Sequence, residues 1–115
     1  PLTASPHVEP ADDGRWLVEA DGQLAVIDPD SGRETQLAPD FNADDASWGH
    51  DGTYVVAVGQ RAGVHEVVRI DATGRVTTVL RATSRPYLTP RVSPDGRHLL
   101  LHALERPFEY VLFPR

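Results

Sequence analysis

The side chains with the most chemistry to offer are carboxylates, and one stretch spaces them like a cation-binding loop. Asp40, Asn42 and Asp44 place oxygen-bearing side chains at alternate positions, and Asp51 falls at the twelfth position of an EF-hand calcium loop. The sixth position of that loop requires glycine for its sharp turn, but this chain has Asp45 there. We therefore reject the EF-hand and expect an acidic loop, with a weak cation site formed by Asp40, Asn42 and Asp44 as the alternative.

The remaining reactive side chains form no pattern that predicts catalysis. His98 and His102 share a strand face, but at ~3.3 Å per residue they stand roughly 13 Å apart, too far to ligate one metal directly. No serine lies in the Gly-x-Ser-x-Gly elbow of a hydrolase, and without cysteine or lysine there is no thiolate chemistry and no lysine-ended phosphate loop. We therefore expect no catalytic residue and no cofactor, and assign any catalysis to a domain outside this chain.

Composition and charge limit the partners that the chain can bind. Its 115 residues are enough for one globular domain, and a hydrophobic content of 40% favours a packed core. The formal net charge of -6 disfavours nucleic-acid binding, which needs a basic surface. The apolar runs are far shorter than the ~20 residues that span a bilayer, so we expect no membrane insertion by this segment.

Three Asp-Gly pairs that recur at regular intervals predict tight hairpin turns. The pairs Asp13-Gly14, Asp51-Gly52 and Asp95-Gly96 recur at intervals of roughly 40 residues, and a half-apolar, strand-like run follows each of them. Glycine readily adopts the positive φ that such turns require, while the aspartate can accept hydrogen bonds from the amides of the turn. We interpret these aspartates as structural residues.

The same order of elements follows each Asp-Gly pair and predicts an all-β fold. The unit is strand, Asp-Gly turn, strand, loop, strand, glycine-containing turn, strand, at the period of ~40 to 45 residues expected for a β-propeller blade. We predict an incomplete ring of about two and a half to three four-stranded antiparallel blades. They form a single partial propeller domain over residues 1–115, with blade units roughly at 5–38, 43–81 and 87–115.

One turn resembles the signature of a known repeat family. The segment Ser93-Pro94-Asp95-Gly96-Arg97 is similar to the Ser-Pro-Asp-Gly-Arg motif of TolB-type, WD-like β-propeller repeats, and residues 47–52 look like a degenerate second copy. The first copy, at residues 8–15, departs from the pattern by an apparent insertion before its turn. The resemblance implies relatives among periplasmic scaffold proteins, substrate-gating domains of prolyl-oligopeptidase-like and tricorn-like peptidases, and bacterial sensor domains. Composition leaves the compartment unknown, and this resemblance alone favours a periplasmic or extracytoplasmic location.

The repeats also predict which side chains fill the core. Trp16 and Tyr54 both stand two residues after the glycine of their turn, so we expect equivalent, buried packing positions. Mid-strand apolar residues should likewise be buried where blades pack together. This core set is Leu17, Val26, Val56, Val58, Val67, Leu99 and Leu101.

These observations predict a non-catalytic binding, sensor or scaffold module that takes a protein or peptide ligand. The alternatives are a fragment of a peptidase's substrate-gating propeller, and a natural or engineered propeller fragment that assembles with itself. An incomplete ring leaves apolar faces uncovered, so we expect self-association or the remainder of a longer propeller to close it. If the chain associates with itself, we expect residues 1–5 of a second copy to pair along residues 109–113.

Overall fold

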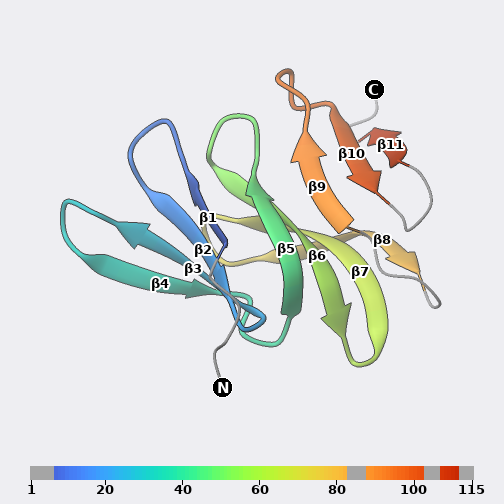
Figure 1. Cartoon of the computed structure of the whole chain (residues 1–115), viewed down its shortest axis with the longest axis horizontal. Coiled ribbons are helices and arrows are strands. Elements are labelled where there is room, and N and C mark those ends of the chain that lie inside the picture. The colour runs from blue at the N-terminus through green and yellow to red at the C-terminus, as the bar shows by residue number, and fades with distance from the viewer. Residues whose placement is uncertain (1–6, 83–87, 103–106, 112–115) are drawn as a thin grey trace.

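The computed structural model of the chain consists of antiparallel β-sheets (Figure 1). It describes residues 7–82, 88–102 and 107–111, and the side chains of residues 8–81 and 90–100. Within these ranges no residue is helical, so the described chain has no helix that could cross a membrane. The expected pairing of residues 1–5 along residues 109–113 lies partly outside the described residues.

In the described ranges eleven strands form three sheets, which we call blades 1, 2 and 3. Blade 1 contains, in order, β1 (His7–Pro10), β2 (Trp16–Ala20), β3 (Gln23–Asp28) and β4 (Arg33–Leu37). Blade 2 contains, in order, β5 (Asn42–Trp48), β6 (Tyr54–Arg61), β7 (Val64–Asp71) and β8 (Val76–Ala82). Blade 3 contains β9 (Leu88–Val92), β10 (His98–His102) and β11 (Pro107–Val111) among the described residues.

The blades stand face to face in the manner of a propeller. The strand β5 of blade 2 contacts β2 of blade 1 on one side and β9 of blade 3 on the other. The turns after β1, β5 and β9 lie at the same end of the molecule, which we call the turn end (Figure 1). The all-β fold and the incomplete propeller are thereby confirmed.

The three regularly spaced Asp-Gly pairs form the turns between the first two strands of each blade, as expected. In the second turn, Asp51 Oδ1 accepts hydrogen bonds from the backbone N–H of Thr53 at 3.0 Å and from its hydroxyl at 2.6 Å. In the third, Asp95 Oδ1 accepts from Arg97 N–H at 3.0 Å and from Ser93 Oγ at 2.6 Å. These hydrogen bonds hold the pKa of both carboxyl groups below its usual range.

The first turn is one residue shorter than the other two. Each side chain of the strand that follows therefore lies on the opposite face of the sheet from the one that counting from the glycine predicts. The closing hydrogen bond joins Ala11 N–H to Arg15 O in blade 1, but Gly49 N–H to Tyr54 O in blade 2. Arg15 is therefore equivalent to Tyr54, and the expected equivalence of Trp16 and Tyr54 is wrong. The expected insertion before the turn is also wrong, because the difference is a residue missing after Gly14.

This shift places Trp16 outside the core. Side chains alternate across a strand, so a change of one residue moves each of them to the opposite face. Leu17 is fully buried between blades 1 and 2, whereas the neighbouring Trp16 is 39% exposed on the outer face of blade 1. The prediction that Trp16 fills the core is corrected accordingly.

Two apolar clusters fill the spaces between the blades. The first joins blades 1 and 2 through residues that include Leu17, Leu24, Trp48, Val55 and Ile70. The second joins blades 2 and 3 through Tyr54, Val56, Val58, Val67 and Leu99. The predicted core is thus confirmed for Leu17, Val56, Val58, Val67 and Leu99, while Val26 is half-buried and Leu101 lies outside the described side chains.

One carboxylate is buried within blade 2, far along the strands from the turn end. Glu66 on β7 is 3% exposed, and it accepts hydrogen bonds from both Nε and Nη2 of Arg61 at 3.1 Å and from the Thr78 hydroxyl at 2.8 Å. Arg81 Nε lies 3.8 Å from the same carboxylate. Burial raises the pKa of Glu66, but these hydrogen bonds and positive charges outweigh it and hold the pKa below its usual range.

We expect Glu66→Gln to destabilise the chain by about 1–2 kcal/mol, at the low end for a buried pair because Arg61 is partly exposed. Chemical denaturation at pH 7 measures this loss, with Glu34→Gln on the exposed β4 as the control. Because the folded-state pKa of Glu66 is lowered, its ionised form stabilises the fold at neutral pH, and that contribution disappears as pH falls through the folded pKa. The two stabilities should therefore begin to converge as pH falls below about 4.3, the ordinary pKa of a glutamate, and a constant difference from pH 7 to pH 3 would contradict the assignment.

Candidate functional site

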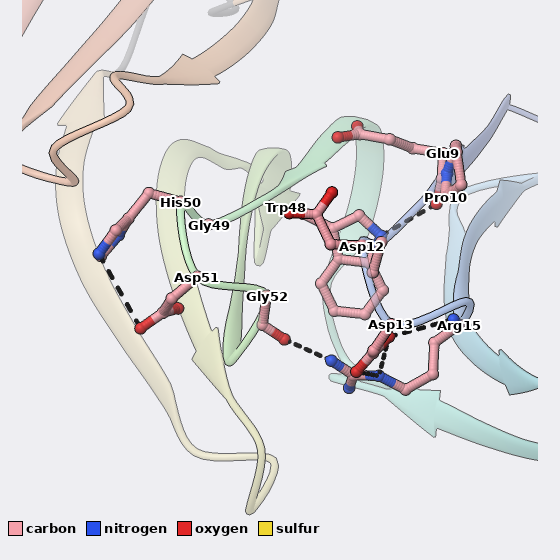
Figure 2. Close-up of a pocket in the computed structure, with 11 residues that line it drawn as sticks. Glu9, Pro10, Asp12, Asp13, Arg15, Trp48, Gly49, His50, Asp51 and Gly52 are labelled. Carbon is pink, nitrogen blue, oxygen red and sulfur yellow. Dashed lines mark hydrogen bonds and ion pairs between the residues drawn. The ribbon is translucent and has the colours of Figure 1, made fainter.

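A polar pocket of about 260 Å³ opens at the turn end between blades 1 and 2 (Figure 2). The turn of residues 9–13 forms one wall, and the turn of residues 48–52 forms the other. Arg15 and the indole of Trp48 lie between these walls. We call this space the acidic pocket, because Glu9, Asp12, Asp13 and Asp51 all line it.

Arg15 connects the two turns. Its Nη2 donates a hydrogen bond to the carbonyl of Gly52 at 2.6 Å, and its Nε forms an ion pair with Asp13 at 2.8 Å (Figure 2). The guanidinium carbon also lies 4.7 Å from the centroid of the Trp48 ring, within the range of a cation–π contact. The same side chain therefore joins blade 1 to the turn and to the aromatic ring of blade 2.

Trp48 is held from the opposite side as well. Its indole Nε1 donates to the carbonyl of Glu9 at 2.9 Å, and the hydroxyl of the adjacent Ser47 donates to the Glu9 carboxylate at 3.2 Å. With Arg15 over the ring and Glu9 at its edge, the indole is 8% exposed. The orientation of Trp48 in the pocket is consequently fixed by contacts from blade 1.

A second pocket, of about 250 Å³, lies on the other side of Arg15 and Trp48. Its floor is apolar and consists of Val26, Leu37, Val55 and Ile70. Polar side chains from both blades form its rim, including Asp28, Arg33, Thr53 and Asp71. Because Arg15 and Trp48 line both spaces, this apolar pocket and the acidic pocket adjoin.

The charges around the acidic pocket are mostly negative. The backbone N–H of Arg15 and then its guanidinium hold the pKa of Asp13 below its usual range, against the opposing effect of desolvation. The hydroxyl and N–H of Thr53 lower the pKa of Asp51 in the same way. Both carboxyl groups are ionised at neutral pH, so the pocket suits a positively charged or hydrogen-bond-donating group better than an anion.

A corresponding contact joins the turns of blades 2 and 3. The hydroxyl of Tyr54, the equivalent of Arg15, is hydrogen-bonded to Nδ1 of His50 at 3.3 Å, and burial raises the pKa of this tyrosine. Arg69 lies over the tyrosine ring at 4.4 Å. The imidazole of His50 in turn lies so close to Gly96 that a Cβ there would collide with it.

The predicted cation loop lies on a strand rather than in a loop. The strand β5 already begins at Asn42, and a bulge between Ala43 and Asp45 leaves Asp44 exposed while Ala43 is buried. The side-chain oxygen of Asn42 lies against Gly22, and Asp40 stands in the preceding turn. Within the described ranges, no three His, Asp or Glu side chains are grouped to hold a metal.

Sequence reasoning did not identify Arg15 and Trp48 as site residues. They belong to different repeats and meet only when blades 1 and 2 pack together, so no local motif contains them both. The nearest signal is the Asp-Gly turn beside each of them, whose aspartates the sequence predicts to be structural. That interpretation holds for the hydrogen bonds of Asp13 and Asp51, but the same carboxylates also line the acidic pocket.

Comparisons with known proteins identify the fold but not the family. No family model and no curated protein matches the sequence. Among solved structures, a protein from Lactobacillus plantarum matches with a TM-score of 0.57 and 16% identity, over 91% of this chain and 36% of that one. A protein from Bacteroides fragilis, provisionally named a 6-phosphogluconolactonase, matches with a TM-score of 0.57 and 14% identity, over 96% of this chain and 40% of that one.

These matches support a propeller fold and correct one expectation. The chain spans less than half the length of either solved protein. The sequence led us to expect that the chain is not an enzyme. That expectation is wrong as a reason to exclude enzymes, because a similar strand arrangement occurs in a protein named for an enzymatic activity. At 14% identity the match establishes the fold alone.

The contact between His50 and Gly96 can be tested by a matched pair of substitutions. Gly96 and Gly74 both have positive φ, 74° and 87°, but only Gly96 has a neighbour where a Cβ would stand. Backbone strain should cost both alanine variants about 1–2 kcal/mol, and overpacking should add about 1–3 kcal/mol to Gly96→Ala alone.

Thermal and denaturant unfolding measure both costs. In a His50→Ala background the collision disappears, so the extra cost of Gly96→Ala should disappear with it. Equal costs for Gly96→Ala and Gly74→Ala in the natural background would show that the turns of blades 2 and 3 do not pack as described.

Proposed function

We propose that this chain is a β-propeller module that binds a ligand at its turn end, in the two adjoining pockets between blades 1 and 2. The observation that carries the proposal is the sharing of Arg15 and Trp48 by an acidic and an apolar pocket. Ligand sites typically combine an apolar surface with a few fixed polar groups, and they favour the space between structural units. A binding, sensor or scaffold role of the whole domain, residues 1–115, is consistent with this arrangement.

The ligand class that fits both pockets is a peptide segment with a basic side chain next to an apolar one. A guanidinium or ammonium group would meet the carboxylates of Glu9, Asp12 and Asp51 in the acidic pocket. An adjacent leucine-sized side chain would cover the apolar floor formed by residues such as Val55 and Ile70. A peptide is also what a substrate-gating propeller would meet, so that alternative role would use the same site.

The Ser93–Arg97 turn supports a relationship to TolB-type repeats as part of this proposal. The name of the Bacteroides fragilis protein suggests a phosphorylated sugar lactone as another ligand class. Such an anion would face the carboxylates of the acidic pocket, where Arg15 is already paired with Asp13. We therefore use a phosphorylated sugar as the comparison ligand in the test rather than as a second proposal.

Tryptophan fluorescence provides the test, with Trp16→Phe as the background so that Trp48 is the one remaining reporter. An acetylated, amidated Leu-Arg peptide should shift the emission of Trp48, whereas Leu-Glu and glucose 6-phosphate should not. Asp12→Asn should weaken Leu-Arg binding about two- to fivefold, because it removes one pocket charge without removing the turn hydrogen bonds of Asp13.

Asp30→Asn is the matched control, since Asp30 is an exposed turn residue that lines neither pocket. Its affinity for Leu-Arg should equal that of the background chain. The effect of Asp12→Asn should also shrink at high ionic strength. Equal binding of Leu-Arg and Leu-Glu, or no shift with millimolar Leu-Arg, would contradict the proposal.

A further inference from the structure

The outer face of blade 1 has the register of a face that is buried elsewhere in the molecule. On this face Trp16 pairs with Ile27, and Val18 pairs with Ala25. Allowing for the shorter first turn, the equivalent pairs in blade 2 are Val55 with Ile70 and Ala57 with Val68. Those four residues of blade 2 are buried, because blade 1 packs against them.

The apolar residues of the outer face of blade 1 remain partly uncovered. Trp16 is 39% exposed, and Val8, which lies opposite Val18, is 45% exposed. Val18, Ala25 and Ile27 are half-buried. Blade 1 therefore presents the kind of surface that receives a preceding blade, and we call it the receiving face.

Blade 3 presents the complementary surface. Leu100 on β10 is equivalent to Leu17 of blade 1 and Val56 of blade 2, both of which are fully buried against the following blade. Leu100 itself is 42% exposed. Beside it lies a hollow of about 240 Å³ lined by Arg91, Val92, Ser93, His98 and Leu100, and we call this surface the donating face.

We infer that the chain associates head to tail with a second copy, the receiving face of each copy packing on the donating face of the other. A second copy is the occupant that the surfaces favour, because one chain carries both members of the complementary pair. Two copies with three sheets each would form a closed ring of about six sheets, within the four to eight that propellers contain. Closure by rotation would cover both pairs of faces at once.

The bulkiest exposed side chain and the hollow provide the specific contact. Trp16 is the largest exposed side chain of the receiving face, and an open hollow lies beside Leu100 on the donating face. Arg91 lines that hollow and could lie over the indole, as Arg15 lies over Trp48 between blades 1 and 2. A buried tryptophan with an arginine beside it is the usual composition of an interface hot spot.

Sedimentation equilibrium of the full 115-residue chain at micromolar concentration tests the inference. The expected mass is twice the 12.6 kDa of one chain. Trp16→Ser and Leu100→Ser should each raise the dissociation constant about tenfold or more. Both residues are substantially exposed in the single chain, so circular dichroism and the unfolding of the dissociated chain should be nearly unchanged.

Mixing the two variants distinguishes this arrangement from a symmetric contact of two Trp16 faces. A mixed pair retains one natural interface, between the Trp16 face of the Leu100→Ser chain and the Leu100 face of the Trp16→Ser chain. The other interface of the mixed ring carries both substitutions, and residues in contact lose less together than the sum of their separate losses. The mixture should therefore associate more strongly than either variant alone. Asp30→Asn, which changes neither face, should associate like the natural chain.

Several outcomes would overturn the inference. A natural chain that stays monomeric would indicate that blades of another polypeptide segment cover these faces. Association that survives Leu100→Ser but not Trp16→Ser would indicate a symmetric Trp16 contact instead. An assembly larger than two copies would exclude the closed ring.

Discussion

The length of the first hairpin turn in each blade decides which side chains meet the neighbouring blade, and the rest of the structure depends on this register. Side chains alternate across a strand, so one residue more or fewer exchanges the two faces of the sheet. In blade 1 the short turn directs Leu17 toward blade 2 and Trp16 away from it. The inter-blade core and the uncovered outer face are therefore two consequences of the same single-residue difference.

Equivalent positions at the turn end join neighbouring blades by different chemistry. Arg15 reaches the carbonyl of Gly52 directly, whereas its equivalent Tyr54 is hydrogen-bonded to His50, which lies against Gly96. Both contacts lie where the apolar packing between blades ends and solvent begins. Polar contacts at such an edge contribute little stability individually, so the clusters beneath them stabilise the arc and these contacts set how the turns approach each other.

The fold could be predicted from the sequence because its signals are local. Asp-Gly turns and alternating strands are complete within each repeat, and their spacing defines the blade. The faces could not be assigned by counting, since Trp16 and Tyr54 stand equally far from Gly14 and Gly52 while the closing hydrogen bonds differ by one residue. The site was missed for another reason: Arg15 and Trp48 are distant in sequence and meet only through packing of the blades.

The proposed binding at the turn end and the proposed association through the outer faces would use separate residues, although some of those residues are adjacent in sequence. Arg15 and Trp48 line both pockets and also hold blades 1 and 2 together, so a change in ligand chemistry there would also alter inter-blade packing. Trp16 and Leu100 belong to neither apolar cluster and line neither of those pockets. Because Arg15, just before β2, and Trp16, at its first position, point to opposite faces of blade 1, substitutions at Trp16 would change the proposed association without changing the proposed binding site.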